Sequence, residues 1–422
     1  MQGNGTWRVA PLGADRRHPT RSDGDDDAAG LRAALSSDGR SAIRPGVARL
    51  GRVLHPADGS DQDPGPLPRG RQHPSRPGRA DGGAIGTARG SEHRCGPDFS
   101  QPVPKGGYVW WYVDGISDDG SYALTVIAFI GSVFSSYYAA SRRFGDGDPL
   151  NHCAVNVALY GRSSKHWALT ERTRSDLTRD ASTLSIGPSS LRWKDNALTI
   201  DIDEITVPFP SRIKGRVTIR PEALVGRAFA LDAAERHSWH PIAPSARIEV
   251  ALESPKLSWS GNGYLDCNFG DEPLEAAFRE WDWARAKIGG DTLVLYDVTA
   301  RTGDELSLAL RFDGKGGIET FDPPLRAALP GTFWRIARHA RSADASPRLI
   351  KTLEDTPFYA RSLVGATIGG ERVVLVHESL SLDRVKNPIV RAMLPFRMPR
   401  RRWHRGSSRQ SLASSAGVSS SR

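Results

Sequence analysis

Two short segments combine side chains that could donate, accept or relay a proton. They are His237-Ser-Trp239 and Tyr264-Leu-Asp266. In an extended chain, side chains two residues apart lie on one face, and Pro241 biases the residue before it away from helix. We therefore expect two strands that bring the four side chains together, although each pair alone is also typical of a purely structural strand.

Other kinds of catalytic site find less support. A zinc site would have to combine His237 and His240 with the distant His152, but a spacing of three residues suits a helix better than an extended segment. The chain also lacks the G-x-S-x-G, P-loop and G-x-G-x-x-G motifs. The sequence therefore predicts neither a metal nor a cofactor and disfavours phosphate-dependent and nicotinamide-dependent chemistry.

The elements that must position these side chains are predicted to be strands. Apolar residues alternate with polar ones in 198–202, 246–250 and 306–310, which is typical of antiparallel strands with one buried face. The best helical candidate is 272–287, although its Trp281-Asp-Trp283 suits a strand equally well. More continuous apolar runs favour strands covered on both faces; they are 108–113, 124–130, 293–296 and 373–376.

The two ends of the chain differ from its centre in composition and charge. Residues 1–97 are rich in Gly, Pro, Arg and Asp, carry a net charge of +4 and contain no lysine, so we expect a disordered leader and consider an over-extended start. Residues 98–383 carry −5 and residues 384–422 carry +10. Because the central body is acidic and lacks nucleic-acid motifs, we predict no nucleic-acid partner.

The cysteines and one basic segment indicate where in the cell the protein is located. Three cysteines, odd in number and far apart in sequence, argue against a disulfide framework and favour a reducing compartment. The segment 384–403 mixes large apolar residues with cations and has no acid, as a membrane-surface anchor would, but it could equally pack on the body. The Ser-rich end beyond Arg405 is expected to be disordered.

From about Pro97 to Arg402 the chain resembles the carotenoid 1,2-hydratases of photosynthetic bacteria, also called hydroxyneurosporene synthases. The resemblance rests on long strings, which coincidence does not explain. They include YVWWYVDGISDDGSYALTVIAFIGSVFSSYY (108–138), NHCAVNVALYG (151–161), WALTER (167–172), HSWHPIAP (237–244), GYLDCNFGDEPLE (263–275), WDWARA (281–286) and MPRR (398–401).

The resemblance implies an all-β fold with two lipocalin-like, calycin-type antiparallel β-barrel domains between disordered extensions. Strand patterns place the domains at 98–240 and 241–390, between the leader 1–97 and a basic, Ser-rich tail at 391–422. The family adds water to the terminal 1,2 double bond of an acyclic carotene, such as neurosporene or lycopene, without a cofactor. Its H-x-W motif falls on His237 and Trp239, and its Y-x-D motif falls on Tyr264 and Asp266.

Hydration of an isolated alkene needs a strong proton donor, because protonation must create a tertiary cation before water can attack. A carboxylic acid can serve if burial raises its pKa. We predict that Asp266 is this acid, with Asp282 and Asp297 as weaker candidates. Trp239 and Tyr264 are expected to stabilise the cation through their ring faces.

Two roles stay open for His237: it could orient Asp266, or it could position and deprotonate the attacking water. The substrate is expected to occupy the interior of a barrel. The basic tail would bring the enzyme to an anionic membrane, so we expect a cytoplasmic protein at the periphery of the inner, photosynthetic membrane. Two alternatives remain: a non-catalytic lipocalin-like carrier, or a related enzyme of cation chemistry on another terpenoid.

Overall fold

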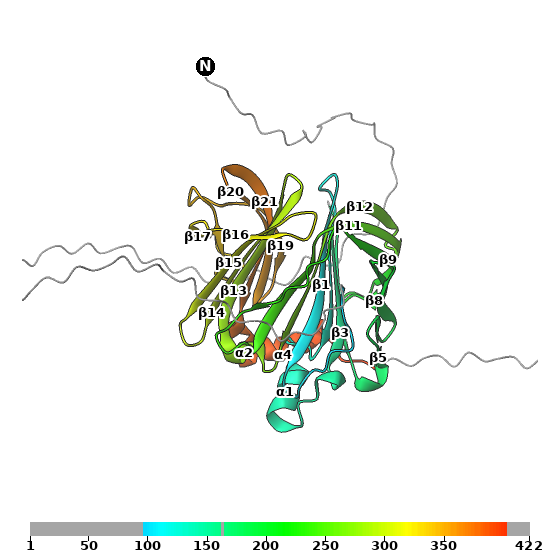
Figure 1. Cartoon of the computed structure of the whole chain (residues 1–422). Coiled ribbons are helices and arrows are strands. Elements are labelled where there is room, and N and C mark those ends of the chain that lie inside the picture. Colours follow the sequence, from blue (N-terminus) through cyan, green and yellow to red (C-terminus); the bar gives the residue numbers. More distant parts are fainter. Residues whose placement is uncertain (1–95, 162–163, 403–422) are drawn as a thin grey trace, which may run out of the picture. The chain divides into compact units, whose positions relative to one another are not determined.

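The computed structural model describes residues 96–161 and 164–402 (Figure 1). Strands make up most of this part of the chain, and the pairings between the named strands are all antiparallel. The all-β prediction is therefore confirmed. The leader up to residue 95 and the Ser-rich end beyond Arg405, both expected to be disordered, lie outside the described residues.

The first sheet has twelve strands in the order β4-β3-β2-β1-β12-β11-β9-β8-β7-β6-β5, with β10 paired to β11. It curls until β4 lies against β8 and β3 against β6. Apolar side chains such as Val113, Val126 and Leu265 fill the space inside. The strands are β1 (Tyr108–Ser117), β2 (Ala123–Ile130), β3 (Cys153–Tyr160), β4 (Lys165–Arg172), β5 (Leu177–Arg179), β6 (Thr183–Ile186), β7 (Ser189–Lys194), β8 (Ala197–Ile205), β9 (Arg212–Pro221), β10 (Phe229–Ala230), β11 (His237–Ser254) and β12 (Leu257–Gly270).

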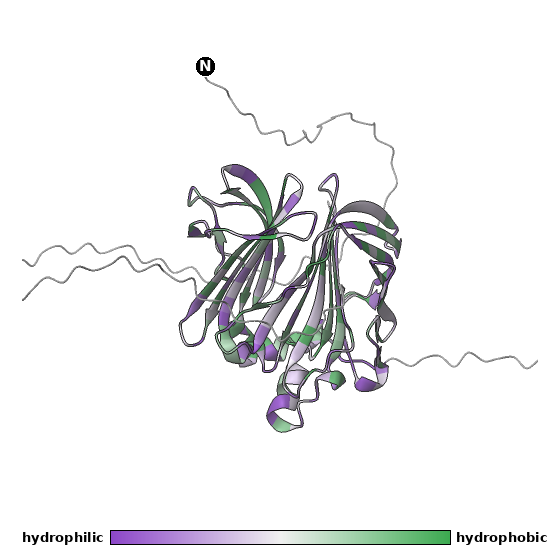
Figure 2. Cartoon of the chain, viewed as in Figure 1, coloured by the Kyte–Doolittle hydropathy of each residue, from purple (hydrophilic) through white to green (hydrophobic). Residues whose placement is uncertain are grey.

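The second sheet has seven strands in the order β16-β15-β14-β13-β21-β20-β19, and a separate pair, β17 and β18, lies beside β13. Apolar residues run along the strands of both sheets, whereas hydrophilic residues gather in many of the connecting loops (Figure 2). The strands are β13 (Phe278–Ile288), β14 (Asp291–Ala300), β15 (Glu305–Phe312), β16 (Ile318–Thr320), β17 (Arg326–Ala328), β18 (His339–Arg341), β19 (Arg348–Asp355), β20 (Tyr359–Ile368) and β21 (Glu371–Ser381).

The continuous apolar run of β1 is explained by packing on both of its faces. Val109 and Trp111 point into the core of the first sheet. Tyr108, Trp110 and Tyr112 point the other way, into a second apolar cluster shared with the second sheet. A strand buried on both sides has no need of polar residues at alternate positions.

The chain passes from the first sheet to the second after Gly270, not near residue 240 as we expected. Residue 240 lies inside β11, which turns at its end and returns as β12, and both strands belong to the first sheet. The turn at Pro255 and Lys256 stays within the first sheet, so a turn in the sequence pattern does not by itself show where the chain changes sheet. Whether each sheet is a separate folding domain stays a prediction.

The helix expected over 272–287 is wrong for most of its length. Only Leu274–Ala277 is helical (α2), and the chain from Phe278 onward is strand β13. Its alternate residues serve two different cores: Trp281 and Trp283 pack toward the first sheet, and Ala284 and Ala286 pack on the other face. This requirement for two apolar faces favours a strand over a helix.

Helices gather at one end of the sheets (Figure 1). α1 contacts α4, where the Ser136 hydroxyl donates to the Arg391 carbonyl at 2.5 Å, and α3 contacts both α2 and α4. In the described part of the chain no helix has the length and apolarity to cross a bilayer. The remaining helices are α1 (Ser136–Phe144), α3 (Leu382–Lys386) and α4 (Pro388–Arg397), with 3-10 turns at Pro149–Asn151 and Arg174–Asp176.

Helix α4 shows how the basic segment after Asp383 is used. Val390 and Leu394 are buried against the body, whereas Ile389 and Phe396 are 72% and 79% exposed. The helix therefore packs on the body, which was one of the two alternatives for this segment. It also presents an apolar outer face, which a membrane-surface anchor, the other alternative, would need.

Candidate active site

The four predicted side chains lie on the neighbouring antiparallel strands β11 and β12. All are buried: His237, Trp239 and Tyr264 are fully covered, and Asp266 is 4% exposed. They share the face of the first sheet that packs against the second. The ring of Trp239, for example, lies 5.3 Å from that of Tyr296 on β14, between centroids.

Asp266 is the centre of a small hydrogen-bonded group. Its Oδ2 accepts from Trp239 Nε1 at 2.9 Å and from the Tyr264 hydroxyl at 2.7 Å. Its Oδ1 is buried and has no hydrogen-bond partner among the described residues. One oxygen of the carboxyl group is thus held in place by two donors while the other is left free to react.

Burial raises the pKa of Asp266 to about 7, against the opposing effect of the hydrogen bonds from Trp239 and Tyr264. The negative charges of Glu378 and Asp114 raise it further. Burial also raises the pKa of the Tyr264 hydroxyl, which therefore keeps its proton and acts as a donor. When Asp266 is protonated, its proton belongs on Oδ1, because Oδ2 already accepts two hydrogen bonds.

Asp266 borders a cavity of about 60 Å³ between the two sheets. The cavity has space for a few water molecules or for the branched end of a hydrocarbon chain. Most of its wall is aromatic. The lining residues are Trp110, Tyr112, Ile127, Phe129, Phe134, Asp266, Asn268, Trp281, Trp283, Tyr296, Tyr359, Glu378 and Leu380.

The cavity is not inside a barrel, where we expected it. Leu265 and Cys267 point into the first sheet and help to fill its interior. Asp266 stands between them in sequence and therefore points to the opposite face. Successive side chains of a strand point to opposite faces. This alternation, which correctly grouped the site residues, also places them outside the barrel.

The aromatic residues predicted to face the cation do not border the cavity. Trp239 and Tyr264 instead donate their polar hydrogens to Asp266. The ring of Tyr264 lies behind that of Trp283, with 5.2 Å between centroids, and Trp283 is one of the cavity residues. The two residues thus hold one oxygen of the Asp266 carboxyl group and oppose the rise of its pKa on burial.

His237 lies apart from this group. Its Nδ1 is 2.9 Å from the Tyr108 hydroxyl and its Nε2 is 3.4 Å from Glu272 Oε1. Burial lowers the pKa of His237, and a neutral ring protonated on Nε2 satisfies both neighbours. In the described part of the chain it makes no hydrogen bond to Asp266, so the geometry gives no support to direct orientation of Asp266, one of the two roles left open for His237.

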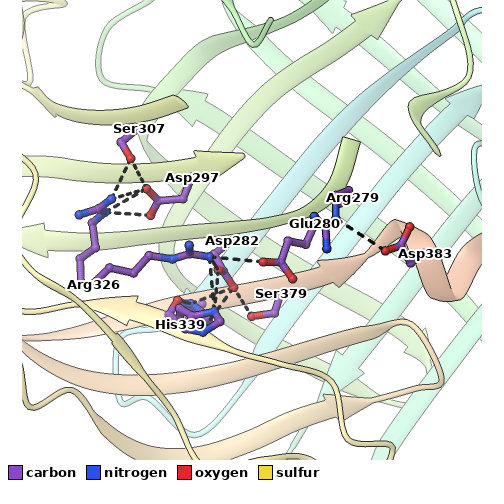
Figure 3. Close-up of polar contacts among 11 residues, drawn as sticks. Arg279, Glu280, Asp282, Asp297, Ser307, Arg326, His339, Ser379 and Asp383 are labelled. Atoms are coloured by element: carbon purple, nitrogen blue, oxygen red, sulfur yellow. Dashed lines mark hydrogen bonds and ion pairs between the residues drawn. The ribbon is translucent and has the colours of Figure 1, made fainter. Parts of the chain in front are cut away.

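The two weaker candidates for the acid are both held in ion pairs (Figure 3). Asp282 accepts from Arg326 at 2.8 Å, and Asp297 accepts from Arg341 at 2.7 Å. Although burial alone would raise the pKa of Asp282, hydrogen bonds from His339 and other neighbours hold it below its usual value. Asp282 is therefore a poor proton donor, and Arg341 binds both carboxyl oxygens of Asp297, so Asp266 remains the best candidate.

The three histidines considered for a zinc site point to different partners. His152 contacts Glu171 at 2.8 Å, and His240 Nε2 lies 2.6 Å from the Val225 carbonyl oxygen. Within the described ranges, no cluster of three or more His, Cys, Asp or Glu side chains has the arrangement to hold a metal ion. The structure therefore does not bring His152, His237 and His240 together.

Sequence reasoning missed a buried polar group beside the cavity. Arg361 binds Glu378 and Asp114, and the Tyr112 hydroxyl donates to Glu378 Oε1 at 2.7 Å. Arg285 binds the other oxygen of Asp114 at 2.5 Å. One signal was present in the sequence: the alternation that places Tyr112 and Asp114 on the same face of β1 as Trp110.

Comparison with known proteins assigns the chain to a family. A sequence model of the family described as carotenoid hydratase CrtC matches residues 126–406, which is more than half of the chain. This chain belongs to the carotenoid hydratase CrtC family. The match spans both sheets and includes all four residues of the H-x-W and Y-x-D motifs.

Two relatives are similar over nearly their whole length. The acyclic carotenoid 1,2-hydratase of Thiocapsa roseopersicina is 52% identical over 402 residues, which cover 95% of this chain and 99% of the relative. That of Rubrivivax gelatinosus is 49% identical over 398 residues, covering 93% and 97%. Since only 5% of this chain is left outside the first alignment, most of residues 1–97 are shared with that relative.

Among solved structures, that of CghA covers 66% of this chain and 88% of its own, with 12% identity and a TM-score of 0.45.

Proposed function

We propose that this protein adds water across the terminal 1,2 double bond of an acyclic carotene and gives a tertiary alcohol at C1. Family membership supports this substrate class, and the relatives named above carry the same activity in their names. The observation that carries the proposal is the free Oδ1 of buried Asp266 at an aromatic cavity.

In the first step, protonated Asp266 donates the proton on Oδ1 to C2. The π electrons of the double bond form the new C2–H bond, and C1 becomes a tertiary cation. Because the pKa of Asp266 is raised to about 7, a useful fraction of the acid form exists near neutral pH. Trp239 and Tyr264 stabilise the carboxylate that remains, through their hydrogen bonds to Oδ2.

The cation then lies among aromatic rings. A cation over an aromatic face is stabilised by about 0.5–2 kcal/mol for each ring. Water captures C1, and loss of a proton completes the tertiary alcohol. The chemistry is supplied by side chains and water alone. The rings that border the cavity are Trp110, Tyr112, Phe129, Phe134, Trp281, Trp283, Tyr296 and Tyr359.

A carotene is far longer than this cavity, so only its end enters. Phe134 borders the cavity and also a narrow crevice between α1 and the α3–α4 segment, beside Val385 and Leu394. We place the entrance here because Phe134 borders both the crevice and the cavity, and Arg391 and Leu394 of α4 form part of the crevice wall. Neurosporene and lycopene share the reacting end group and both fit this scheme.

We also propose that α4 rests on an anionic membrane at the inner face of the cell. Its exposed Ile389, Met393 and Phe396 would enter the headgroup boundary, where apolar side chains of interfacial helices insert. The exposed cations Arg401 and Arg402 follow the helix. This arrangement would present the entrance to a substrate dissolved in the bilayer.

A carrier of hydrophobic ligands has no use for a buried acid that faces its ligand, so the geometry favours an enzyme over that alternative. The test is to incubate the purified protein with lycopene or neurosporene and to measure the product mass. We expect the mass of one added water for each hydrated end. Tight binding without any mass change would instead support a carrier.

A further inference from the structure

A second carboxyl group, Glu378, borders the same cavity as Asp266. Glu378 lies on β21 of the second sheet, whereas Asp266 lies on β12 of the first. The two acids therefore reach the cavity from opposite sheets. A substrate end between the sheets would have one carboxyl group on each side.

Glu378 and Asp266 differ in the charge of the side chains that bind them. Glu378 Oε1 accepts from the Tyr112 hydroxyl at 2.7 Å and forms an ion pair with Arg361. Asp266 receives hydrogen bonds from neutral donors and has no ion pair among the described residues. An adjacent cation stabilises a carboxylate, so Glu378 is suited to accept a proton and Asp266 to donate one.

The contacts of Glu378 also leave it one free oxygen. Both of its polar partners bind Oε1, and no described residue forms a hydrogen bond with Oε2. Arg361 is fully buried and is fixed from its other side by Asp114 at 2.5 Å. The Glu378 side chain is thus held in a defined position, with an acceptor oxygen to spare at the cavity.

We propose that Glu378 is the general base that takes a proton from the attacking water. The proposal rests on the hydration reaction proposed above. As the water oxygen forms its bond to C1, one of its O–H bonds breaks and the proton passes to Glu378. Asp266 ends the cycle as a carboxylate and Glu378 as an acid, and proton exchange with solvent restores both groups.

The test compares Glu378→Gln with wild type in D₂O, with lycopene as substrate. Loss of a positioned base typically lowers the rate of its step by about 10²–10⁴-fold, so hydration should fall by that factor. The proton transfer from Asp266 does not need Glu378. The cation should therefore form, with a deuteron added at C2, and fail to capture water. When the Asp266 carboxylate then removes the original hydrogen from C2 instead of the deuteron, the double bond forms again and deuterium stays at C2 of the recovered lycopene.

Glu354→Gln is the matched control. Glu354 is a buried glutamate of the second sheet, bound by the Tyr160 hydroxyl at 3.1 Å and by Lys165 at 2.9 Å, but it does not border the cavity. We expect this variant to hydrate lycopene as wild type does.

Three outcomes separate the possibilities. Loss of hydration with continued deuterium entry at C2 supports Glu378 as the base. Loss of both in a folded Glu378→Gln protein, or wild-type hydration by it, overturns that role. If wild type itself neither hydrates lycopene nor exchanges deuterium, the proposed function fails, independently of Glu378.

Discussion

At the residue scale, the proposed chemistry depends on which oxygen of Asp266 carries the acidic proton. Trp239 and Tyr264 both donate to Oδ2 of Asp266, and this leaves Oδ1 as the position for the acidic proton. The same two hydrogen bonds moderate the effect of burial, which alone would raise the pKa of Asp266 still further. In the hydration proposed above, a substantial fraction of Asp266 would carry its proton near pH 7, and the same two hydrogen bonds would stabilise the carboxylate that remains after transfer.

The pH dependence of catalysis follows from this pKa. Only protonated Asp266 can donate, and its pKa is raised to about 7. We expect kcat/KM for lycopene to be constant on the acid side and to fall about tenfold per pH unit above pH 7. The measurement is the initial hydration rate between pH 5 and 9. A rate that rises through this range would show that a deprotonated group begins the reaction.

The residue types of the site could be predicted from the sequence, but their roles could not. Strand parity placed His237 with Trp239, and Tyr264 with Asp266, on common faces, as the structure has them. An aromatic side chain can turn its ring face to a substrate, or it can donate its N–H to a carboxyl group. Side-chain packing decides between the two. Trp239 was expected to use its face and uses its N–H instead.

At the element scale, the opposite wall of the site comes from β13, β14, β20 and β21. The order of apolar residues predicted strands at 293–296 and 373–376. This order does not show which face of one sheet packs against which face of the other. For this reason Glu378 escaped notice, since its position becomes meaningful only when β21 lies opposite β12. The change of sheet after Gly270 was missed for the same reason.

His237 is best explained by what it does for these elements. It lies at the start of β11 and binds Tyr108 at the start of β1 and Glu272 in the segment leading to α2. We expect His237→Ala to lower the free energy of unfolding by about 2–4 kcal/mol, because two buried hydrogen bonds and a well-packed ring are lost. Urea unfolding followed by tryptophan fluorescence measures this.

The control for that variant is His240→Ala, which removes a half-buried ring on the same strand and should cost less. Any loss of activity in His237→Ala should be proportional to its loss of folded protein. The kcat/KM of the protein that stays folded should still fall above about pH 7, as it does in wild type. A fully stable His237→Ala protein without activity would return His237 to a direct role in the reaction.

At the scale of the whole molecule, α4 connects the site with its surroundings. We expect the protein to sediment with vesicles of phosphatidylcholine and phosphatidylglycerol at low salt. The double change Ile389→Glu/Phe396→Glu should weaken this binding, because it places charge on the exposed apolar face. The double change Arg401→Glu/Arg402→Glu should weaken it too, since each cation near such a surface contributes about 1 kcal/mol.

Arg400 must be left intact in this experiment. It binds Glu171 and donates to the Asn151 carbonyl at 2.9 Å, so reversing its charge would disturb the body of the protein. Phe209→Glu is the control, because Phe209 is 85% exposed on the loop between β8 and β9, outside α4. Equal sedimentation of all variants at every salt concentration would contradict docking through α4.

The most direct test of the whole account is the hydration of lycopene by Asp266→Asn in D₂O. The amide matches the carboxyl group in shape and can accept from Trp239 and Tyr264, but it has no acidic proton to give. Burial raises the pKa of Asp266 in the folded protein to about 7, so the folded state loses stability as the pH rises from the ordinary pKa of an aspartate to about 7, by about 1.4 kcal/mol per pKa unit, and loses no more above that pH. The neutral amide avoids this cost, so the variant should remain folded. We expect wild type to give an alcohol with deuterium at C2, and Asp266→Asn to give no alcohol and no deuterium in the recovered lycopene. Hydration by the folded variant at a rate near that of wild type would contradict the account.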